Sequence, residues 1–336
     1  MAVSYRRDAS RTSGQVTIRW GVIGCGAVCE VKSLPALQLT PGFVVAGVTR
    51  RDQRAARAFA ERHHVARVFA SPEALIADPD IDAVYIATPP AAHLGTALAV
   101  ADAGKPCCVE KPMTVSGADS GALVRAFEQA GKPLFVAYYR RMLPRFRRLK
   151  TWLESGAIGT VRAVHWQLNR PPSETDLDGS GHWRTDPNMA GGGYFVDLAS
   201  HGLDLLQFLL GDIEQVTGVA VNQQGLYSAE DAVAASFAFA SGPLGTGQWN
   251  FGADERVDEL EFIGSTGRIT CSVLDEHPLR LTTRTDRIEQ WVANPRHVQL
   301  YHAEAMARHL AGLANHPSCG ADALKTDRVL DAILGR

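Results

Sequence analysis

The sequence predicts an α/β fold in its N-terminal half and an α+β fold in its C-terminal half. Strand-like and Ala-rich helix-like segments alternate up to about residue 140, which is typical of a doubly wound parallel sheet with helices on both faces. Beyond that point β-like runs follow one another with few helices between them, as in a large, open and mainly antiparallel sheet. The length of 336 residues also fits two domains.

The N-terminal half contains the regular alternation. Strands are expected at 17–23, 43–49, 66–69, 83–88, 106–109 and 134–138. Helices are expected at 27–39, 53–64, 91–103 and 117–130. Turn signals such as Pro41-Gly42 end these helical segments.

The C-terminal half begins with a basic segment at 143–155 that is expected to be a connecting helix. The β-like runs are 160–169, 215–222, 231–240, 244–251, 258–263, 268–273 and 279–284, and further helices are expected at 194–210, 301–314 and 326–334. We therefore divide the chain into a disordered leader (1–15), a first domain (16–140) and a second domain (141–336).

Composition excludes several classes of protein. The net charge is −2, with 34 basic against 36 acidic residues, whereas a nucleic-acid or membrane-surface protein would need a basic excess. No apolar run approaches the roughly 18 residues of a transmembrane helix, and the polar start of the chain is not a signal peptide. The six cysteines form no CxxC pair, which favours reduced thiols in a cytoplasmic protein and no metal site.

A glycine-rich turn joins the first predicted strand to the first predicted helix. It has the sequence Gly24-Cys25-Gly26-Ala27-Val28-Cys29. In a dinucleotide site the first glycine makes the tight turn, the second lets the backbone approach the pyrophosphate, and the helix N-terminus faces the phosphates. Cys29 stands where Gly or Ala is usual. The turn predicts a Rossmann-type nucleotide site, and the alternative is a plain glycine-rich turn of an α/β protein.

The end of the second predicted strand indicates the type of dinucleotide. A carboxylate at this place binds the ribose of NAD, but the sequence has Thr49-Arg50-Arg51-Asp52. Two guanidinium groups suit the 2′-phosphate of NADP because arginine forms charge-assisted hydrogen bonds with phosphate. NAD remains the alternative, with Asp52 as the ribose acid if the loop register shifts by two. The arginines could also be solvated loop residues.

Polar residues follow the fourth and fifth predicted strands and begin a later helix. Thr88-Pro89 and His93 follow the fourth strand, and Glu110-Lys111-Pro112 follows the fifth. Ligands of open α/β sheets bind outside the carboxyl ends of the strands, so both segments are expected in one crevice. Downstream, a triple glycine leads into a helix on which Asp197 and His201 are four residues apart and share one face.

Together these segments resemble the glucose–fructose oxidoreductase / inositol dehydrogenase / rhizopine-catabolism (Gfo/Idh/MocA) family, from about Ile18 to the C-terminus. The resemblance implies a Rossmann domain followed by a substrate-binding and oligomerisation domain. It implies oxidation or reduction of one hydroxyl or carbonyl carbon of a sugar, cyclitol or related polyol with NAD(H) or NADP(H). It also implies that Trp183 and Arg184 face the substrate, and we assign Arg140 to the same group.

Hydride transfer to or from a carbinol carbon needs a group that moves the hydroxyl proton and a cation or donor that stabilises the developing alkoxide. Lys111 supplies the ammonium, His201 can exchange the proton, and Asp197 can orient the imidazole or bind a substrate hydroxyl. Which of Lys111 and His201 is the immediate acid–base group stays open.

Two other functions remain as alternatives at this point. One is a non-catalytic dinucleotide-binding sensor of the same fold, which would not need Lys111 and His201. The other is a reductase of a non-sugar substrate, such as a dihydrodiol or a tetrapyrrole. We also expect a homodimer or homotetramer, because the runs at 234–239 and 248–251 fit a sheet-to-sheet contact, although they could equally pack on the domain's own helices.

Overall fold

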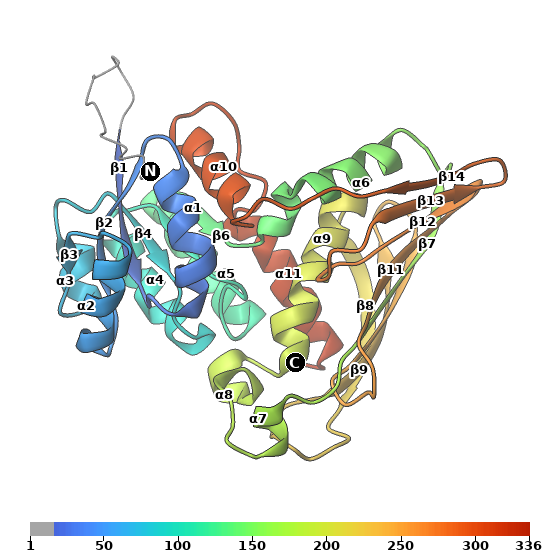
Figure 1. The fold of residues 1–336 in the computed structure, drawn as a ribbon, viewed down its shortest axis with the longest axis horizontal. Helices are drawn as coiled ribbons and strands as arrows, with labels where there is room; N and C mark the ends of the chain where they lie inside the picture. Colours follow the sequence, from blue (N-terminus) through green and yellow to red (C-terminus); the bar gives the residue numbers. More distant parts are fainter. Residues whose placement is uncertain (1–16) are drawn as a thin grey trace, which may run out of the picture.

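The computed structural model describes residues 17–336, so the predicted leader lies outside the described residues. The first sheet has six strands in the order β3-β2-β1-β4-β5-β6, and every neighbouring pair is parallel (Figure 1). The strands are β1 (Ile18–Ile23), β2 (Phe43–Thr49), β3 (Arg67–Val68), β4 (Ala83–Ile86), β5 (Cys107–Val109) and β6 (Leu134–Val136). The order reverses at β1, which confirms the predicted doubly wound sheet.

Helices cover both faces of this sheet. One face carries α1 (Leu34–Leu39), which continues the π-helical turn Cys29–Ser33, and α2 (Gln53–Arg62). The other carries α3 (Pro72–Ala77), α4 (His93–Asp102) and α5 (Gly117–Ala130). The sequence did not predict α3, because six residues are too few to show a helical period.

The second sheet has eight strands in the order β14-β13-β12-β11-β7-β10-β9-β8. They are β7 (Val161–Asn169), β8 (Ile213–Val221), β9 (Ala232–Phe239), β10 (Leu244–Asn250), β11 (Val257–Gly264), β12 (Gly267–Cys271), β13 (Leu279–Thr283) and β14 (Arg287–Gln290). All neighbouring pairs are antiparallel except β7 and β10, so the sheet is mainly antiparallel as predicted. The edge strand β14 was missed, since it is polar and shows no apolar alternation.

Helices α6 (Pro144–Glu154), α9 (Ser200–Leu210) and α11 (Gly320–Ile333) pack on one face of this sheet. Within residues 17–336 no helix lies on the other face, as Figure 1 shows. The aromatic residues of the two runs that suggested a sheet-to-sheet contact, Phe237, Phe239, Trp249 and Phe251, are buried on the helix side. Those side chains therefore pack on the chain's own helices, and only the alternate residues of the runs face the open side.

The remaining helices connect the two sheets. They are the short α7 (Glu174–Leu177) and α8 (Pro187–Ala190), and α10 (Leu300–Leu310). Ala303 and Met306 of α10 lie in the core of the first sheet, and α11 packs against both α5 and α9. The last two helices thus return to the first sheet, although the chain leaves that sheet after β6 and enters the second sheet with β7. Among residues 17–336, no helix is long and apolar enough to cross a membrane.

Candidate active site

A crevice of about 1280 Å³ lies between the carboxyl ends of the first sheet and loops and helices of the C-terminal half of the chain. Almost every predicted site residue lines it. These residues are Gly24, Gly26, Ala27, Val28, Thr49, Arg50, Arg51, Thr88, Pro89, Glu110, Lys111, Arg140, Trp183, Arg184, Asp197 and His201. The fold therefore brings together segments that are up to about 180 residues apart in the sequence.

Two predicted residues do not line the crevice. The thiol of Cys25 is fully buried and lies 3.8 Å from the carbonyl oxygen of Thr49. His93 is also fully buried, with Nε2 at 2.7 Å from the Thr88 carbonyl and Nδ1 at 3.1 Å from the Pro112 carbonyl. Both side chains are therefore buried away from the crevice, and the assignment of these two residues to cofactor binding stays a prediction. His93 instead ties together the two loops that carry Thr88 and Pro112.

The glycine-rich turn has the geometry that a pyrophosphate needs. Gly24 has φ +86°, and a Cβ atom there would lie 2.7 Å from the amide nitrogen of Thr88, so no larger residue fits. A Cβ atom on Gly26 would have the Gly24 carbonyl oxygen, at 3.9 Å, as its one neighbour within 4 Å. The backbone at Gly26 is therefore open to the crevice. The first amides of a helix have no partner within the helix, and Ala27 and Val28 begin one here. The turn therefore fits the phosphates of a dinucleotide.

The structure places Arg50 directly after β2. Its Nη1 lies 3.5 Å from the carbonyl oxygen of Cys25, next to the glycine-rich turn. Asp52 is engaged elsewhere: its Oδ1 accepts the backbone N–H groups of Arg54 and Ala55, both at 3.0 Å, and caps α2. The Thr49 hydroxyl donates to the Phe69 carbonyl at 2.9 Å.

Lys111 and Asp197 form an ion pair inside the crevice. The Lys111 ammonium donates to Oδ1 of Asp197 at 2.5 Å and to the Asp197 carbonyl oxygen at 2.6 Å. Arg184 reaches the other carboxylate oxygen at 3.1 Å. Burial alone would raise the pKa of the Asp197 carboxyl, but the charges of Lys111 and Arg184 outweigh burial and lower it. Asp197 is therefore ionised and fixes the Lys111 ammonium.

His201 lies on the same helical segment, one turn after Asp197, and both line the crevice as the spacing predicts. Its ring packs edge-on against Tyr139 with centroids 5.4 Å apart, and its Nδ1 is a buried atom without a hydrogen-bond partner among residues 17–336. Burial, followed by the charges of Lys111 and Arg140, lowers the pKa of His201 well below its usual range. The imidazole is neutral near pH 7 and has a nitrogen that can accept a proton.

Glu110 belongs to a buried hydrogen-bond cluster that the sequence did not reveal. The hydroxyl of Tyr85 donates to Oε1 of Glu110 at 2.8 Å, and Nε2 of Gln299 donates to the same oxygen at 2.9 Å. Tyr85 lies in β4, and Gln299 precedes α10 near the end of the chain. Tyr85 and Gln299 thus hold the side chain of Glu110, the residue before Lys111, although no local motif connects them with it.

Several residues of the crevice wall were not predicted from the sequence. They include Lys32, Arg170, His182, Met189, Leu198, Arg256, Leu274 and Gln299. Most lie in loops or short turns, where no period or motif marks them. Lys32 could have been found from its place on the helix that begins at the glycine-rich turn.

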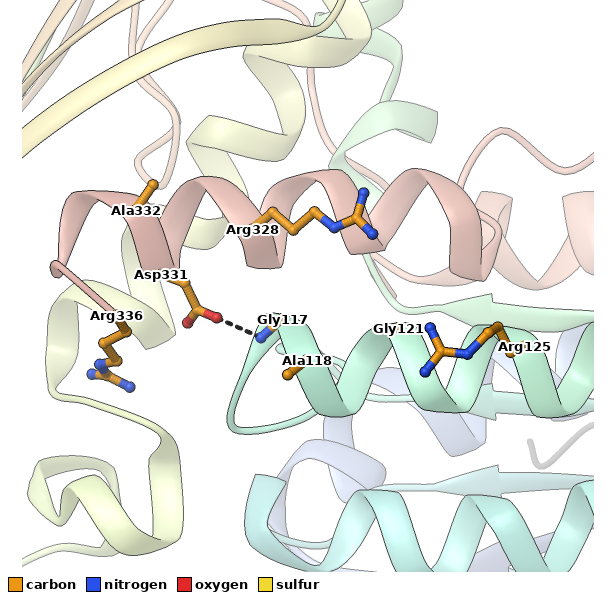
Figure 2. Close-up of a pocket in the computed structure, with 8 residues that line it drawn as sticks. All are labelled: Gly117, Ala118, Gly121, Arg125, Arg328, Asp331, Ala332 and Arg336. Carbon is orange, nitrogen blue, oxygen red and sulfur yellow. Dashed lines mark hydrogen bonds between the residues drawn. The ribbon is translucent and has the colours of Figure 1, made fainter.

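A second hollow of about 450 Å³ lies on the outside, between α5 and α11 (Figure 2). It is lined by Gly117, Ala118, Gly121, Arg125, Arg328, Asp331, Ala332 and Arg336. Asp331 accepts the Gly117 N–H at 2.6 Å and so closes the N-terminus of α5. This hollow contains none of the predicted site residues.

Comparison with known proteins identifies the family of both halves of the chain. Residues 18–138 match the oxidoreductase family with an NAD-binding Rossmann fold, and residues 146–270 match the GFO/IDH/MocA C-terminal domain. The chain is 34% identical over 324 residues to "Oxidoreductase P35" of Formosa agariphila, which covers 95% of this chain and 98% of that protein.

Two further relatives extend the comparison. The chain is 32% identical over 232 residues to 1,5-anhydro-D-fructose reductase of Ensifer adhaerens, which covers 67% of each protein. A solved structure of levoglucosan dehydrogenase in complex with NADH and levoglucosan superposes with a TM-score of 0.85 at 24% identity, covering 95% of this chain and 96% of that one. Its fold is the same. The two matched halves, the crevice between them and the full-length relative lead to one conclusion: the chain is an NAD(P)-dependent oxidoreductase of the GFO/IDH/MocA family.

Proposed function

We propose that the enzyme uses NADP(H) to transfer a hydride to or from a carbinol or carbonyl carbon of a sugar, cyclitol or related polyol. One observation carries this proposal: the Lys111–Asp197 ion pair and the neutral His201 line the same crevice as the glycine-rich turn. A protein that only senses dinucleotide has no use for this group of side chains. The anhydro-sugar reductase at 32% identity supports a sugar-like substrate.

The side chains divide the chemistry between them. The nicotinamide, when bound, supplies or accepts the hydride. The Lys111 ammonium donates to the substrate oxygen and stabilises the negative charge that develops there. Asp197 holds this ammonium at 2.5 Å, and neutral His201 accepts the hydroxyl proton during oxidation or returns it during reduction.

The choice of NADP rests on Arg50 and Arg51. Both line the crevice beside the glycine-rich turn and are exposed, so a 2′-phosphate can reach them. A charge-assisted hydrogen bond is worth about 1.5–3 kcal/mol, although exposure to solvent reduces this value. The variant Arg50→Asp should weaken NADP binding by repulsion and reduce the preference for NADP. Equal binding of NAD and NADP by the parent enzyme would contradict this choice of cofactor.

A panel of sugars and cyclitols tests the reaction itself. Each compound is incubated with NADP and, in parallel, with NAD, and reduced cofactor is followed by its near-ultraviolet absorbance. We expect NADP reduction with at least one polyol and its loss in the variant His201→Ala. Turnover only with aromatic diols or tetrapyrroles would favour the non-sugar reductase instead.

The open face of the second sheet supports a homodimer or homotetramer. Val219 and Leu244 are 67% and 64% exposed on this face, beside the small residues Ala234 and Thr246. A second copy could cover this surface with two-fold symmetry. Light scattering that gives only the mass of one chain would contradict the proposal.

A further inference from the structure

Arg140 is a buried cation without a carboxylate partner. The residue is 9% exposed and lines the crevice. Its Nη1 donates to the carbonyl oxygen of Val273 at 2.7 Å, whereas its Nε is buried and has no hydrogen-bond partner among residues 17–336. Burial of an unpaired charge is unfavourable, so buried charges normally have a counter-charge. For Arg140 the structure supplies none within the described chain, but the crevice gives a ligand access to it.

A loop of the second sheet places another arginine close to Arg140. Arg256 forms an ion pair with Asp275 at 2.5 Å, two residues after the Val273 carbonyl that Arg140 contacts. Asp258 fixes this loop, since its carboxylate accepts the backbone N–H groups of Val273 at 3.1 Å and Asp275 at 2.9 Å. Arg140 and Arg256 are therefore held against the same rigid loop, and both line the crevice.

Arg170 completes this group. It directly follows β7, and because Asn169 and Val257 are the last pair of the antiparallel register of β7 with β11, Arg170 and Arg256 lie at the same end of these two strands. Its guanidinium lies 4.5 Å from the centroid of the Tyr194 ring, and it forms no ion pair within residues 17–336. We call Arg140, Arg170 and Arg256 the arginine wall.

The acidic residues of the crevice do not neutralise the arginine wall. Asp197 is shared between Lys111 and Arg184, and the Asp52 carboxylate caps α2. Oε1 of Glu110 accepts two hydrogen bonds from its own buried cluster. Each acid that lines the crevice is thus engaged elsewhere.

The phosphates of the dinucleotide do not account for the arginine wall either. Their proposed contacts are the glycine-rich turn and Arg50, which follow β1 and β2 of the first sheet. The arginine wall belongs to the segment after β6 and to residues that flank β7 and β11 of the second sheet. Arg256 already has Asp275 as its partner, so the substrate is the remaining source of negative charge for Arg140 and Arg170.

We infer that the substrate is a polyhydroxylated compound with an anionic oxygen group, the carboxylate of a sugar acid or the phosphate of a sugar phosphate. This group binds the arginine wall while the reacting carbinol lies at Lys111 and His201. The inference rests on the proposed function, because it names the substrate class of the same site. Arginine suits this task, since its planar donors match the oxygens of carboxylate and phosphate.

Matched pairs of ligands test the inference. Calorimetry on the NADP-saturated protein compares each hexuronate with its parent hexose, such as D-glucuronate with D-glucose and D-galacturonate with D-galactose. Glucose 6-phosphate and galactose 6-phosphate form the phosphate arm, and cofactor reduction is recorded for every compound. We expect at least one anionic member to bind tenfold or more tightly than its neutral partner, with a tenfold higher kcat/KM. The arm in which this occurs identifies the anion.

The two proposals can fail separately. If no anionic member binds more tightly than its neutral partner, including the case in which none binds, the anionic substrate is overturned. Turnover of neutral polyols would then still support the proposed function. Tight binding of an acid without any cofactor reduction would instead contradict the proposed reaction while retaining the anion site.

Substitutions separate the arginine wall from general effects of charge. Arg170→Gln should reduce the preference for the anionic member at least tenfold, because Arg170 makes no side-chain hydrogen bond that the fold needs. Arg125→Gln is the matched control, since Arg125 is an exposed arginine in the outer hollow of Figure 2 and should leave the preference unchanged. The KM for the acid should also rise with salt while that for the neutral sugar stays constant. An equal loss of this preference in Arg170→Gln and Arg125→Gln would overturn the assignment of the anion to the arginine wall.

Discussion

Arg140 and Arg141 are neighbours in the sequence and are both buried, at 9% and 5% exposure, yet their surroundings differ. Arg141 donates to both carboxylate oxygens of Asp204, at 2.8 and 2.7 Å, and to the Pro317 carbonyl at 2.7 Å. Within residues 17–336, Arg140 donates a hydrogen bond to the Val273 carbonyl and to no other group. One arginine stabilises the fold with a full set of partners, whereas the other has donors left for a ligand.

The two aspartates of the central helical segment show the same difference. Asp204 is completely buried, and burial raises its pKa even though Arg141 opposes this change. Asp197 faces the crevice, and two cations lower its pKa against the effect of burial. The Arg141–Asp204 pair is enclosed in the core, whereas the Lys111–Asp197 pair lines the crevice, where we propose that it takes part in the reaction.

Arg141→Met should cause the largest loss of stability. It leaves the Asp204 carboxylate buried without its partner, which costs about 3–5 kcal/mol in the free energy of unfolding. Arg140→Met is the matched control and should cost roughly 1 kcal/mol or less, because no carboxylate loses a partner. Urea unfolding measures both variants. Equal losses would show that the two arginines have the same role.

Lys111→Ala should reduce kcat roughly 10²–10³-fold, because the ammonium acts on charge that develops in the transition state. Dinucleotide binding and the melting temperature should change little. Lys132→Ala, at an exposed lysine in the loop before β6, serves as the control. A Lys111→Ala enzyme with nearly full turnover would remove Lys111 from the reaction. The double variant with His201→Ala should be little worse than the worse single variant.

The histidines behind the first sheet should make stability depend on pH. His302 and His316 are buried with ring centroids 4.7 Å apart, and burial lowers both pKa values, that of His316 to about 4. Below about pH 6.5 the unfolded chain takes up protons that the folded protein does not, so stability falls with decreasing pH. Each histidine contributes up to about 1.4 kcal/mol per pH unit.

His316→Asn tests this pH dependence, since an amide oxygen can still accept the Ser318 N–H that Nδ1 accepts at 3.0 Å. Between pH 6.5 and 5.5 this variant should lose about 1 kcal/mol less stability than the parent, because the unfolded histidine is only half protonated at pH 6.5. His64→Asn is the control: His64 is exposed at φ 54°, a conformation that asparagine tolerates. The same pH dependence in all three proteins would locate the titrating groups elsewhere.

Tyr85→Phe should have the smallest effect. It removes one of the two hydrogen bonds to Oε1 of Glu110, and Gln299 retains the other at 2.9 Å. We expect a loss of about 1 kcal/mol in stability and a decrease in kcat of a few fold with an unchanged KM. A change in KM alone would mean that Tyr85 affects substrate binding rather than the position of Glu110.

Elements with local signals could be predicted from the amino-acid sequence alone. The glycine-rich turn, the residues after β2, β4 and β5, and the spacing of Asp197 and His201 could be predicted because parallel strands end at one edge and helices repeat every 3.6 residues. The same rules also selected Cys25 and His93, whose side chains are buried away from the crevice. Both lie in the right loops, but the direction of a side chain depends on packing.

The partners of the buried charges, by contrast, become visible only in the folded protein. Nothing in the local sequence distinguishes Arg140 from Arg141. The carboxylate that binds Arg141 and not Arg140 belongs to Asp204, which lies 63 residues after Arg141 in the chain. Likewise, Arg170 and Arg256 are far apart in the chain, and the register of β7 and β11 places them at the same end of neighbouring strands. Hydrophobic periodicity specifies the elements, whereas the pairing of buried charges depends on contacts between distant elements that no local pattern encodes.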